Sequence, residues 1–263
     1  MTLTMQEMKK LAQLSIEAEE SAEPMEPFLS EYPDMTTWEA YEIQKIRNQM
    51  VCEKGKKIIG AKMGSTSLAK LAEFGVYSPP EYGRLFDYMQ LSGEQTLQMD
   101  ALIHPKVEAE LAFITKKSLC GPNVTGSEAL AATESVVAAI EIIDSRFHNF
   151  EFADPDGEAD NLSAARFKLG CIEMPPDRLD LVTLGVKMNI NGQYTGFGAA
   201  GAVLGHPARS LAKLANLLYE NEMELEAGQI VLTGAIISSR KLFSGDKVLA
   251  SFEGLGDISM DVV

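Results

Sequence analysis

The stretch HPKVEAELAF, residues 104–113, alternates polar and apolar side chains in the manner of a half-buried β-strand. Alternation would place Glu108 and Glu110 on one face, about 6.5–7 Å apart along the strand, while the apolar residues between them face a core. Two like charges on one half-buried face are unfavourable unless a cation lies between them. A solvated outer face is the other interpretation of the same spacing.

Glu141 favours the buried interpretation, because it lies inside VVAAIEII, residues 136–143, the most apolar run of the chain. An unpaired carboxylate is costly there, so a buried acid needs a cationic partner, a proton or a metal ion. Three carboxylates without a nearby His or Cys form a set of hard oxygen ligands that suits Mg²⁺, with Mn²⁺ as the alternative. The residues alone also allow a plain ion pair of Glu141 with Arg146 or Lys62.

The rest of the pattern divides the chain near residue 92. The expected elements are helices at 3–20, 36–54 and about 67–74, strands at 57–63, 104–115 and 136–143, a helix after the capping box of Thr125 and Glu128, a hairpin turn at Asn191-Gly192, a helix at 206–221, and strands at 229–235, 247–254 and 257–263. We therefore expect an α+β protein. A helical/α+β N-terminal subdomain would span residues 1–92, and a mostly antiparallel β domain at 93–263 would carry the metal site.

The charge balance limits the partners of the protein. The chain has 38 acidic and 23 basic residues among 263, a net charge of −15. Such a surface repels phosphate backbones and anionic lipids, which argues against nucleic-acid binding and membrane attachment. No apolar run is long enough for a membrane helix, the N-terminus lacks the order of a signal peptide, and the three cysteines form no CxxC pair. We expect a cytoplasmic protein.

Two glycine patterns do not indicate nucleotide binding. Residues 196–201 match GxGxxG, but they follow the Asn191-Gly192 hairpin signal and not a parallel strand that leads into a helix. Residues 55–62 resemble a phosphate-binding loop, yet Ala61 separates the glycine from the lysine that must follow it directly. Neither motif predicts a cofactor site.

Seven segments carry a family resemblance: KIIGAKMGSTS, GVYSPPEYGRLF, IHPKVEAELAF, AIEIIDSRFHNF, EADNLSAARF, VLGHP and IVLTGA. In this order they resemble the fumarylacetoacetate-hydrolase-like superfamily, in the branch of 2-oxopent-4-enoate hydratases and 4-oxalocrotonate decarboxylases of aromatic meta-cleavage pathways. The resemblance runs from about Tyr32 to the end of the chain. It implies a mixed β-sandwich roll, a divalent metal on Glu108, Glu110 and Glu141, and Lys62 beside the substrate.

Details favour the decarboxylase over the hydratase. FHNF, residues 147–150, and Arg166 resemble the decarboxylase pattern. A second cation suits the decarboxylase substrate, 2-oxohex-3-enedioate, because it is a dianion, whereas the hydratase substrate is a monoanion. An ordinary structural ion pair is the alternative role for Arg166. Glu81 points the other way, since it resembles an acid that helps hydratases add water.

The resemblance implies loss of the C6 carboxylate as CO₂, with the 2-oxo group as electron sink and 2-hydroxypenta-2,4-dienoate as product. Lys62 would stabilise the developing dienolate oxygen, and Ser145 and Thr233 are further candidate substrate contacts. The alternatives are a 2-oxopent-4-enoate hydratase that forms 4-hydroxy-2-oxopentanoate and a non-catalytic, metal-binding partner of such a hydratase. The resemblance also implies a homo-oligomer and a complex with the pathway hydratase.

Overall fold

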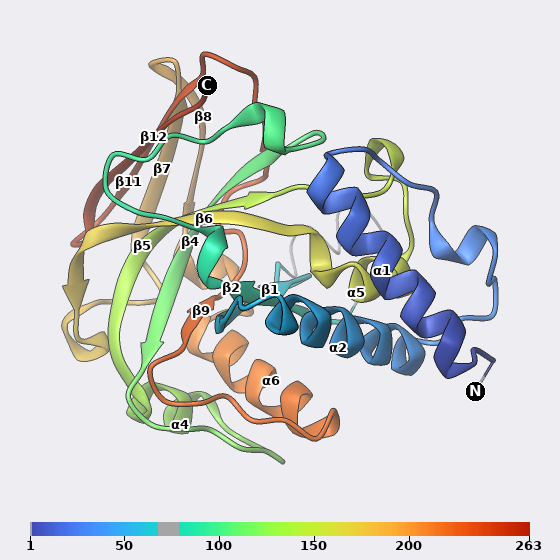
Figure 1. The fold of residues 1–263 in the computed structure, drawn as a ribbon. Coiled ribbons are helices and arrows are strands. Elements are labelled where there is room, and N and C mark those ends of the chain that lie inside the picture. The colour runs from blue at the N-terminus through green and yellow to red at the C-terminus, as the bar shows by residue number, and fades with distance from the viewer. Residues whose placement is uncertain (1, 68–78) are drawn as a thin grey trace.

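The N-terminal helices begin where the sequence predicts. The computed structural model describes residues 2–67 and 79–263 (Figure 1). Helices α1 (Met5–Ser21) and α2 (Thr37–Glu53) each begin with a capping box, in which a threonine and the glutamate three residues later bond each other's backbone. The helix expected at 67–74 lies outside the described residues except for Ser67, which forms a bridge with Val203.

A mixed sheet of eight strands forms the larger layer. Its order is β2-β1-β9-β4-β5-β6-β3, with β10 paired to β4, and only the β1–β9 and β3–β6 pairs are parallel in the described chain. The strands are β1 (Ile58–Gly64), β2 (Glu81–Phe86), β3 (Gln90–Leu91), β4 (Lys106–Thr115), β5 (Thr133–Ile143), β6 (Ala164–Met174), β9 (Ile230–Leu232) and β10 (Arg240–Lys241). The long strands β4 and β5 lie in the interior of the sheet and pair with each other.

A second, antiparallel sheet packs against the first. Its order is β12-β11-β7-β8, from β7 (Gly185–Ile190), β8 (Gln193–Ala199), β11 (Lys247–Phe252) and β12 (Gly256–Asp261). Asn191 and Gly192 turn between β7 and β8 with φ of 54° and 73°, which confirms the predicted hairpin. The GxGxxG letters therefore begin within a hairpin strand. Apolar residues from both sheets share one core, the β-sandwich roll that the resemblance implies.

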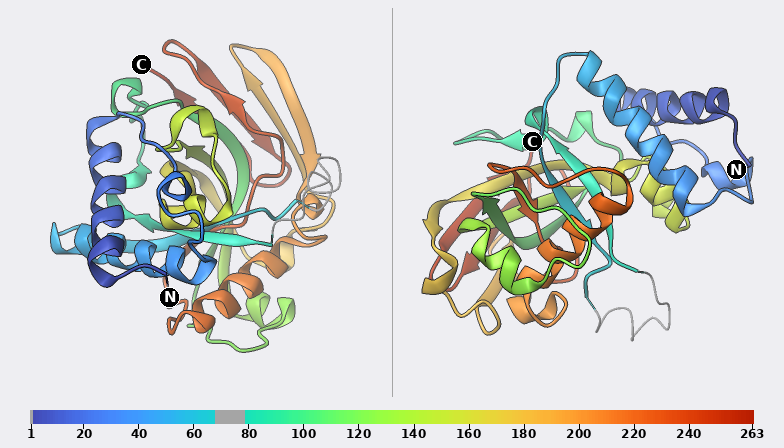
Figure 2. Two further views of the ribbon diagram at one scale, coloured as in Figure 1. Left: turned by 90° about the vertical axis from the view of Figure 1, so that its right-hand side faces the viewer. Right: turned by 90° about the horizontal axis from the view of Figure 1, so that it is seen from below.

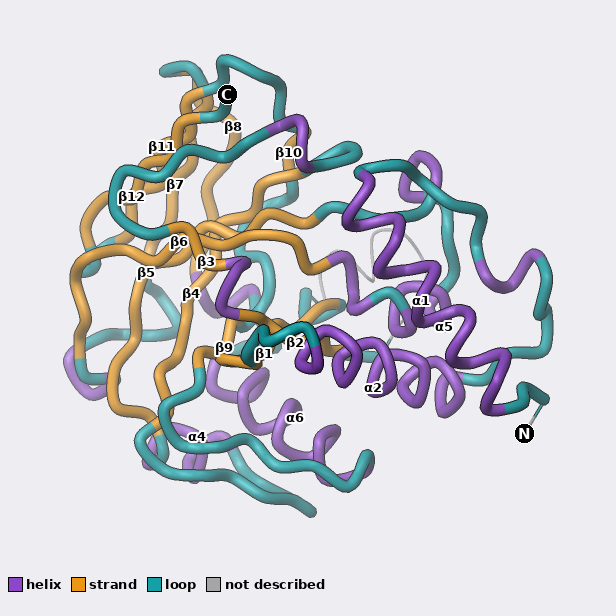
Figure 3. The backbone as a smooth tube through the Cα atoms, viewed as in Figure 1, coloured by secondary structure: helices purple, strands orange, loops and turns teal. Residues whose placement is uncertain are grey.

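The helices gather beside and below the large sheet, away from the second sheet (Figures 2 and 3). α6 (Pro207–Glu220) lies below the β1–β2 ladder in Figure 1, with α4 (Gly126–Ala131) beside it. α5 (Asp154–Ala159) contacts α2. Short 3₁₀ turns lie at Phe28–Ser30, Asp87–Met89, Met99–Ala101, His148–Phe150, Asn161–Ser163, Pro176–Arg178 and Ala200–Ala202.

The first 92 residues contribute three strands to the large sheet. β1 pairs with β9, and β3 pairs with β6, so the ladder joins both sides of the expected boundary. The division at residue 92 stays a prediction about folding units. Within the described chain, no helix is both long and apolar enough to span a bilayer.

Candidate metal centre

The central ladder brings the three predicted carboxylates together. Glu108 of β4 lies directly opposite Glu141 of β5, and Glu110 lies two residues further along the same face. One carboxylate oxygen from each residue lies within 4.8 Å of the others. Glu110 and Glu141 are 0% and 1% exposed, so this part of the strand is not a solvated outer face.

Lys62 supplies the nearest cation. Its Nζ lies 3.3 Å from Glu141 Oε1 and donates a hydrogen bond to the carbonyl oxygen of Leu162, also at 3.3 Å. Burial would lower the pKa of Lys62, but the charges of Glu141 and its neighbours outweigh burial and raise it. The alternative partner, Arg146, instead pairs with Asp160.

The carboxylates still carry more negative charge than one lysine neutralises. Burial, followed by the charges of Glu141 and Glu108, raises the pKa of Glu110 well above its usual value. Within the described residues, Glu110 Oε1 and Glu141 Oε2 are buried and accept no hydrogen bond. Open, oxygen-only donors facing one another fit a hard divalent cation. The residues present therefore fit the implied metal.

Gly234 is a part of this site that sequence reasoning missed. Its N–H donates to Glu110 Oε2 at 2.7 Å and fixes one side of that carboxylate. At φ 106°, a Cβ on Gly234 would lie 2.0 Å from Thr66 Oγ1, so no larger residue fits. The available signal was the glycine two residues after the apolar run of IVLTGA.

A left-handed segment covers Lys62 and was also missed. Asn161, Leu162 and Ser163 have φ of 55°, 51° and 55°. The Asn161 side chain accepts a hydrogen bond from Arg84 N at 2.6 Å and donates one to Arg84 O at 3.0 Å. This double contact anchors the segment to β2, and thereby sets the carbonyl of Leu162 against the lysine. Such residues adopt left-handed backbone only where their surroundings enforce it.

Glu81 begins β2 opposite Gly64, on the ladder face that also carries Lys62, and it is 5% exposed. Its charge, after burial, raises the pKa of Glu158 to about 8. Ser145 and Thr233 are fully buried, and their hydroxyls bond main chain: Ser145 Oγ accepts from Phe147 N at 3.2 Å, and Thr233 Oγ1 donates to Leu111 O at 3.0 Å.

Arg166 is not brought to the carboxylates. It pairs with Ile142, whereas Glu141 pairs with Phe167, and the register of β5 and β6 shifts directly after Ile142. Its guanidinium carbon lies 5.8 Å from the centre of the Tyr88 ring, beside a cavity of about 300 Å³. Arg166 Nη1 donates to the carbonyl of Ala165 at 2.7 Å.

Comparisons with known proteins show which enzymes this chain is similar to. The 4-oxalocrotonate decarboxylase of Pseudomonas sp. (strain CF600) is 41% identical over 259 residues, 98% of this chain and 97% of that protein. The 2-hydroxyhexa-2,4-dienoate hydratase of Comamonas testosteroni is 36% identical over 246 residues, 93% of each. A solved 4-oxalocrotonate decarboxylase from Pseudomonas putida G7, complexed with magnesium and adipate, has a TM-score of 0.96 and 38% identity, with coverage of 100% of this chain and 99% of that one.

The family model of the fumarylacetoacetate (FAA) hydrolase C-terminal region matches residues 57–263. This range contains every strand of both sheets and all four ionic residues of the centre. The predicted resemblance is thereby confirmed, and the chain belongs to the fumarylacetoacetate hydrolase family.

Proposed function

We propose that the protein is a metal-dependent lyase that converts 4-oxalocrotonate (2-oxohex-3-enedioate) to 2-hydroxypenta-2,4-dienoate and CO₂. The observation that carries this proposal is the buried cluster of Glu108, Glu110 and Glu141 beside Lys62. The 41% identity to a 4-oxalocrotonate decarboxylase supports it. The solved relative is complexed with magnesium and with adipate, which is a six-carbon dicarboxylate like the proposed substrate.

The three glutamates would hold Mg²⁺, with Mn²⁺ as the alternative, and the ion would supply a Lewis acid that polarises the 2-oxo group. Lys62 has the charge and the burial to stabilise the negative oxygen that develops at C2. The C5–C6 bond breaks, its electron pair moves through the conjugated system to that oxygen, and CO₂ leaves. A proton on the C2 oxygen, held or given by Lys62, completes the dienol.

Ser145 and Thr233 are the proposed substrate contacts outside this cluster. Ser145 follows β5 and Thr233 follows β9, and the hydroxyl of each already bonds the main chain. We propose that they contact the substrate through their backbone groups. Thr233 precedes Gly234, which bonds Glu110, so a change at Thr233 would also disturb that carboxylate.

Glu81 favours a second candidate, the hydration of 2-hydroxypenta-2,4-dienoate to 4-hydroxy-2-oxopentanoate. Its carboxyl shares the ladder face of Lys62 and is close enough to Glu158 to affect its pKa. An acid in that position has a neighbour with which to exchange a proton during addition of water. The relative from Comamonas testosteroni that is 36% identical is named a hydratase.

A paired assay tests the two activities. One reaction contains 2-hydroxymuconate with its tautomerase, the other contains freshly generated 2-hydroxypenta-2,4-dienoate, and each is run with Mg²⁺ and again with EDTA. We expect Mg²⁺-dependent CO₂ release in the first reaction alone. Consumption of the dienoate alone would replace the proposal by the hydratase. Inactivity in both, with metal bound, would replace it by the non-catalytic partner.

The assembly and location are further parts of the proposal. A dienol product ketonises in water, so direct transfer to a hydratase in the same complex would protect it. We therefore propose a cytoplasmic homo-oligomer that associates with the pathway hydratase. Light scattering on the protein alone, and on its mixture with a hydratase, measures both associations.

A further inference from the structure

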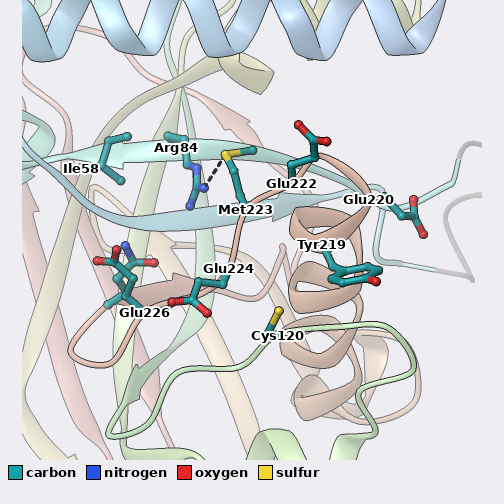
Figure 4. Close-up of a pocket in the computed structure, with 10 residues that line it drawn as sticks. Ile58, Arg84, Cys120, Tyr219, Glu220, Glu222, Met223, Glu224 and Glu226 are labelled. Atoms are coloured by element: carbon teal, nitrogen blue, oxygen red, sulfur yellow. Dashed lines mark hydrogen bonds between the residues drawn. The ribbon is translucent and has the colours of Figure 1, made fainter.

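A cavity lies on the opposite face of the large sheet from the metal centre. It has a volume of about 870 Å³ and lies between the β1–β2 ladder, the C-terminal end of α6 and the loop with Cys120 (Figure 4). Arg84 lines it. Because Arg84 pairs with Ala61 while Lys62 pairs with Gly83, the side chains of Arg84 and Lys62 leave opposite faces of the ladder.

Arg84 is a buried cation that forms no ion pair with a residue of the described chain. It is 5% exposed, and its guanidinium points into the cavity in Figure 4. Nη2 donates only to the thioether of Met223, at 3.2 Å, and Nη1 has no hydrogen-bond partner among residues 2–67 and 79–263. No carboxylate in these ranges forms an ion pair with it. A ligand carboxylate would match the planar fork of a guanidinium and offset its desolvation.

The same cavity also offers an unused acceptor. Gln229 is 9% exposed, and its Oε1 is buried without a hydrogen-bond donor in the described chain. Apolar walls come from Ile58 and Tyr219. A ligand that satisfies both polar groups must carry an acceptor for Arg84, a donor for Gln229 and a short apolar body between them.

The residues around the opening of the cavity determine the charge that suits the ligand group donating to Gln229. Glu220, Glu222, Glu224 and Glu226 all line the opening and are exposed. They repel a plain anion, and the net charge of −15 adds to this repulsion. A ligand whose far end is an ammonium group avoids the penalty, because its positive end meets the carboxylates while its negative end reaches Arg84.

We propose that this cavity is a binding site for a small zwitterionic amino acid, with the carboxylate on Arg84 and the ammonium group toward Gln229 and the glutamate rim. The site is independent of the proposed catalytic function, since none of its contacts involves the metal centre. Met223, in contact with Arg84, is a reporter inside the cavity.

The test uses protein labelled with ¹³C on its methionine methyl groups, with the Met223 signal assigned from a Met223→Leu variant. The probes are glycine, 3-aminopropanoate and 5-aminopentanoate, and matched to the last are pentanoate and pentylamine. We expect a saturable shift of the Met223 signal with at least one amino acid. Pentanoate, which lacks the ammonium group, should bind about fivefold more weakly than 5-aminopentanoate. This factor corresponds to the upper end of the free energy measured for ion pairs with exposed carboxylates.

Three variants keep the test decisive. Arg84→Gln should abolish the saturable shift, while Arg178→Gln, a change at an exposed arginine elsewhere, should preserve it. If Arg84→Gln does not fold, the double change Glu222→Gln and Glu224→Gln alters only the exposed rim. It should weaken 5-aminopentanoate and strengthen pentanoate. Equal binding of pentanoate and 5-aminopentanoate, undiminished binding of 5-aminopentanoate to Arg84→Gln, or no saturable shift with any probe would overturn the proposal.

Discussion

The Arg146–Asp160 pair and the metal centre are two buried ionic clusters, and they differ in how completely their charges are neutralised and hydrogen-bonded. In the Arg146–Asp160 pair, the guanidinium donates to Asp160 Oδ1 at 2.9 Å and to the carbonyls of Asp144 and Ala164 at 2.7 Å and 3.0 Å. Asp160 also accepts from Ser15 Oγ at 2.7 Å. Both ionic residues are 1% exposed.

The metal centre is buried to a similar degree, but it combines three carboxylates with one lysine and leaves two oxygens unbonded within the described residues. The Arg146–Asp160 pair is complete without a ligand and holds the segment 161–163 in place. The metal centre is complete only when another cation arrives. The difference separates structural charge, which the fold neutralises, from functional charge, which the fold leaves open.

The largest expected effect comes from Glu141→Gln. This change removes one proposed metal ligand and the ion pair with Lys62, so we expect activity to fall by about 10³-fold, or ~4 kcal/mol of transition-state stabilisation. The free energy of unfolding without metal should stay the same or rise, because repulsion with Glu110 is relieved. Steady-state rates and calorimetric unfolding with and without Mg²⁺ measure both quantities.

Glu134→Gln is the matched control, since Glu134 is an exposed glutamate of the same strand. It should retain full activity and the increase in Tm on adding Mg²⁺, which Glu141→Gln should lose. An active Glu141→Gln protein that Mg²⁺ still stabilises would remove Glu141 from the metal centre.

Breaking the Arg146–Asp160 pair should lower the free energy of unfolding, in contrast to Glu141→Gln. Arg146→Met leaves Asp160 buried without its main partner, and we expect a loss of about 3–5 kcal/mol in the free energy of unfolding. The double change Arg146→Met and Asp160→Asn should recover part of this loss, because no uncompensated charge remains. Urea unfolding of the four proteins in this cycle measures the coupling. Additive losses would show that the pair has no special stability.

Much of the centre could be predicted from local patterns. Alternation in residues 104–113 placed Glu108 and Glu110 on one face, and the apolar surroundings of Glu141 indicated its burial. The cross-strand register that sets Glu141 opposite Glu108 is a non-local property. Periodicity gives the face of a strand, but it does not give the partner residue on the next strand.

The missed parts depend on backbone geometry. Gly234 contributes an N–H group and Asn161 contributes a left-handed turn, and neither leaves a chemical signature that a list of titratable residues would contain. Arg166 is a second case in which residue type alone does not give the position of a side chain. Its charge suits a dianionic substrate, but the register pairs it with Ile142 and not with Glu141, so its role in substrate binding stays a prediction.

Glu158 extends the comparison to a buried acid without a matched cation. Burial, then the charge of Glu81, raises its pKa from 4.5 to about 8. Between these values the folded protein keeps a proton that the unfolded chain releases, so this residue makes stability fall as pH rises through that window. Glu158→Gln removes the effect. We expect the variant to match the wild type near pH 4.5 and to exceed it by about 1–3 kcal/mol at pH 8.

Unfolding free energies at several pH values, for the wild type and Glu158→Gln, give the slope directly. Glu151→Gln, at an exposed position in the preceding segment, controls for the lost net charge. A difference between the wild type and Glu158→Gln that does not change with pH would mean that Glu158 is already ionised in the folded protein.

The smallest effect is expected for Arg166→Gln, and it is the most informative about substrate choice. If the position opposite Ile142 keeps this guanidinium beside Tyr88, its loss should change kcat/KM for the dicarboxylate by less than about threefold, because an arginine that does not contact the substrate contributes little to binding it. Arg178→Gln serves as the exposed control. A rise of tenfold or more in KM for the dicarboxylate alone, with kcat unchanged, would instead show that Arg166 binds the second carboxylate. In that case Arg166 would select a dianionic substrate, as the sequence predicts, and its side chain would have to reach the substrate around the edge of β6.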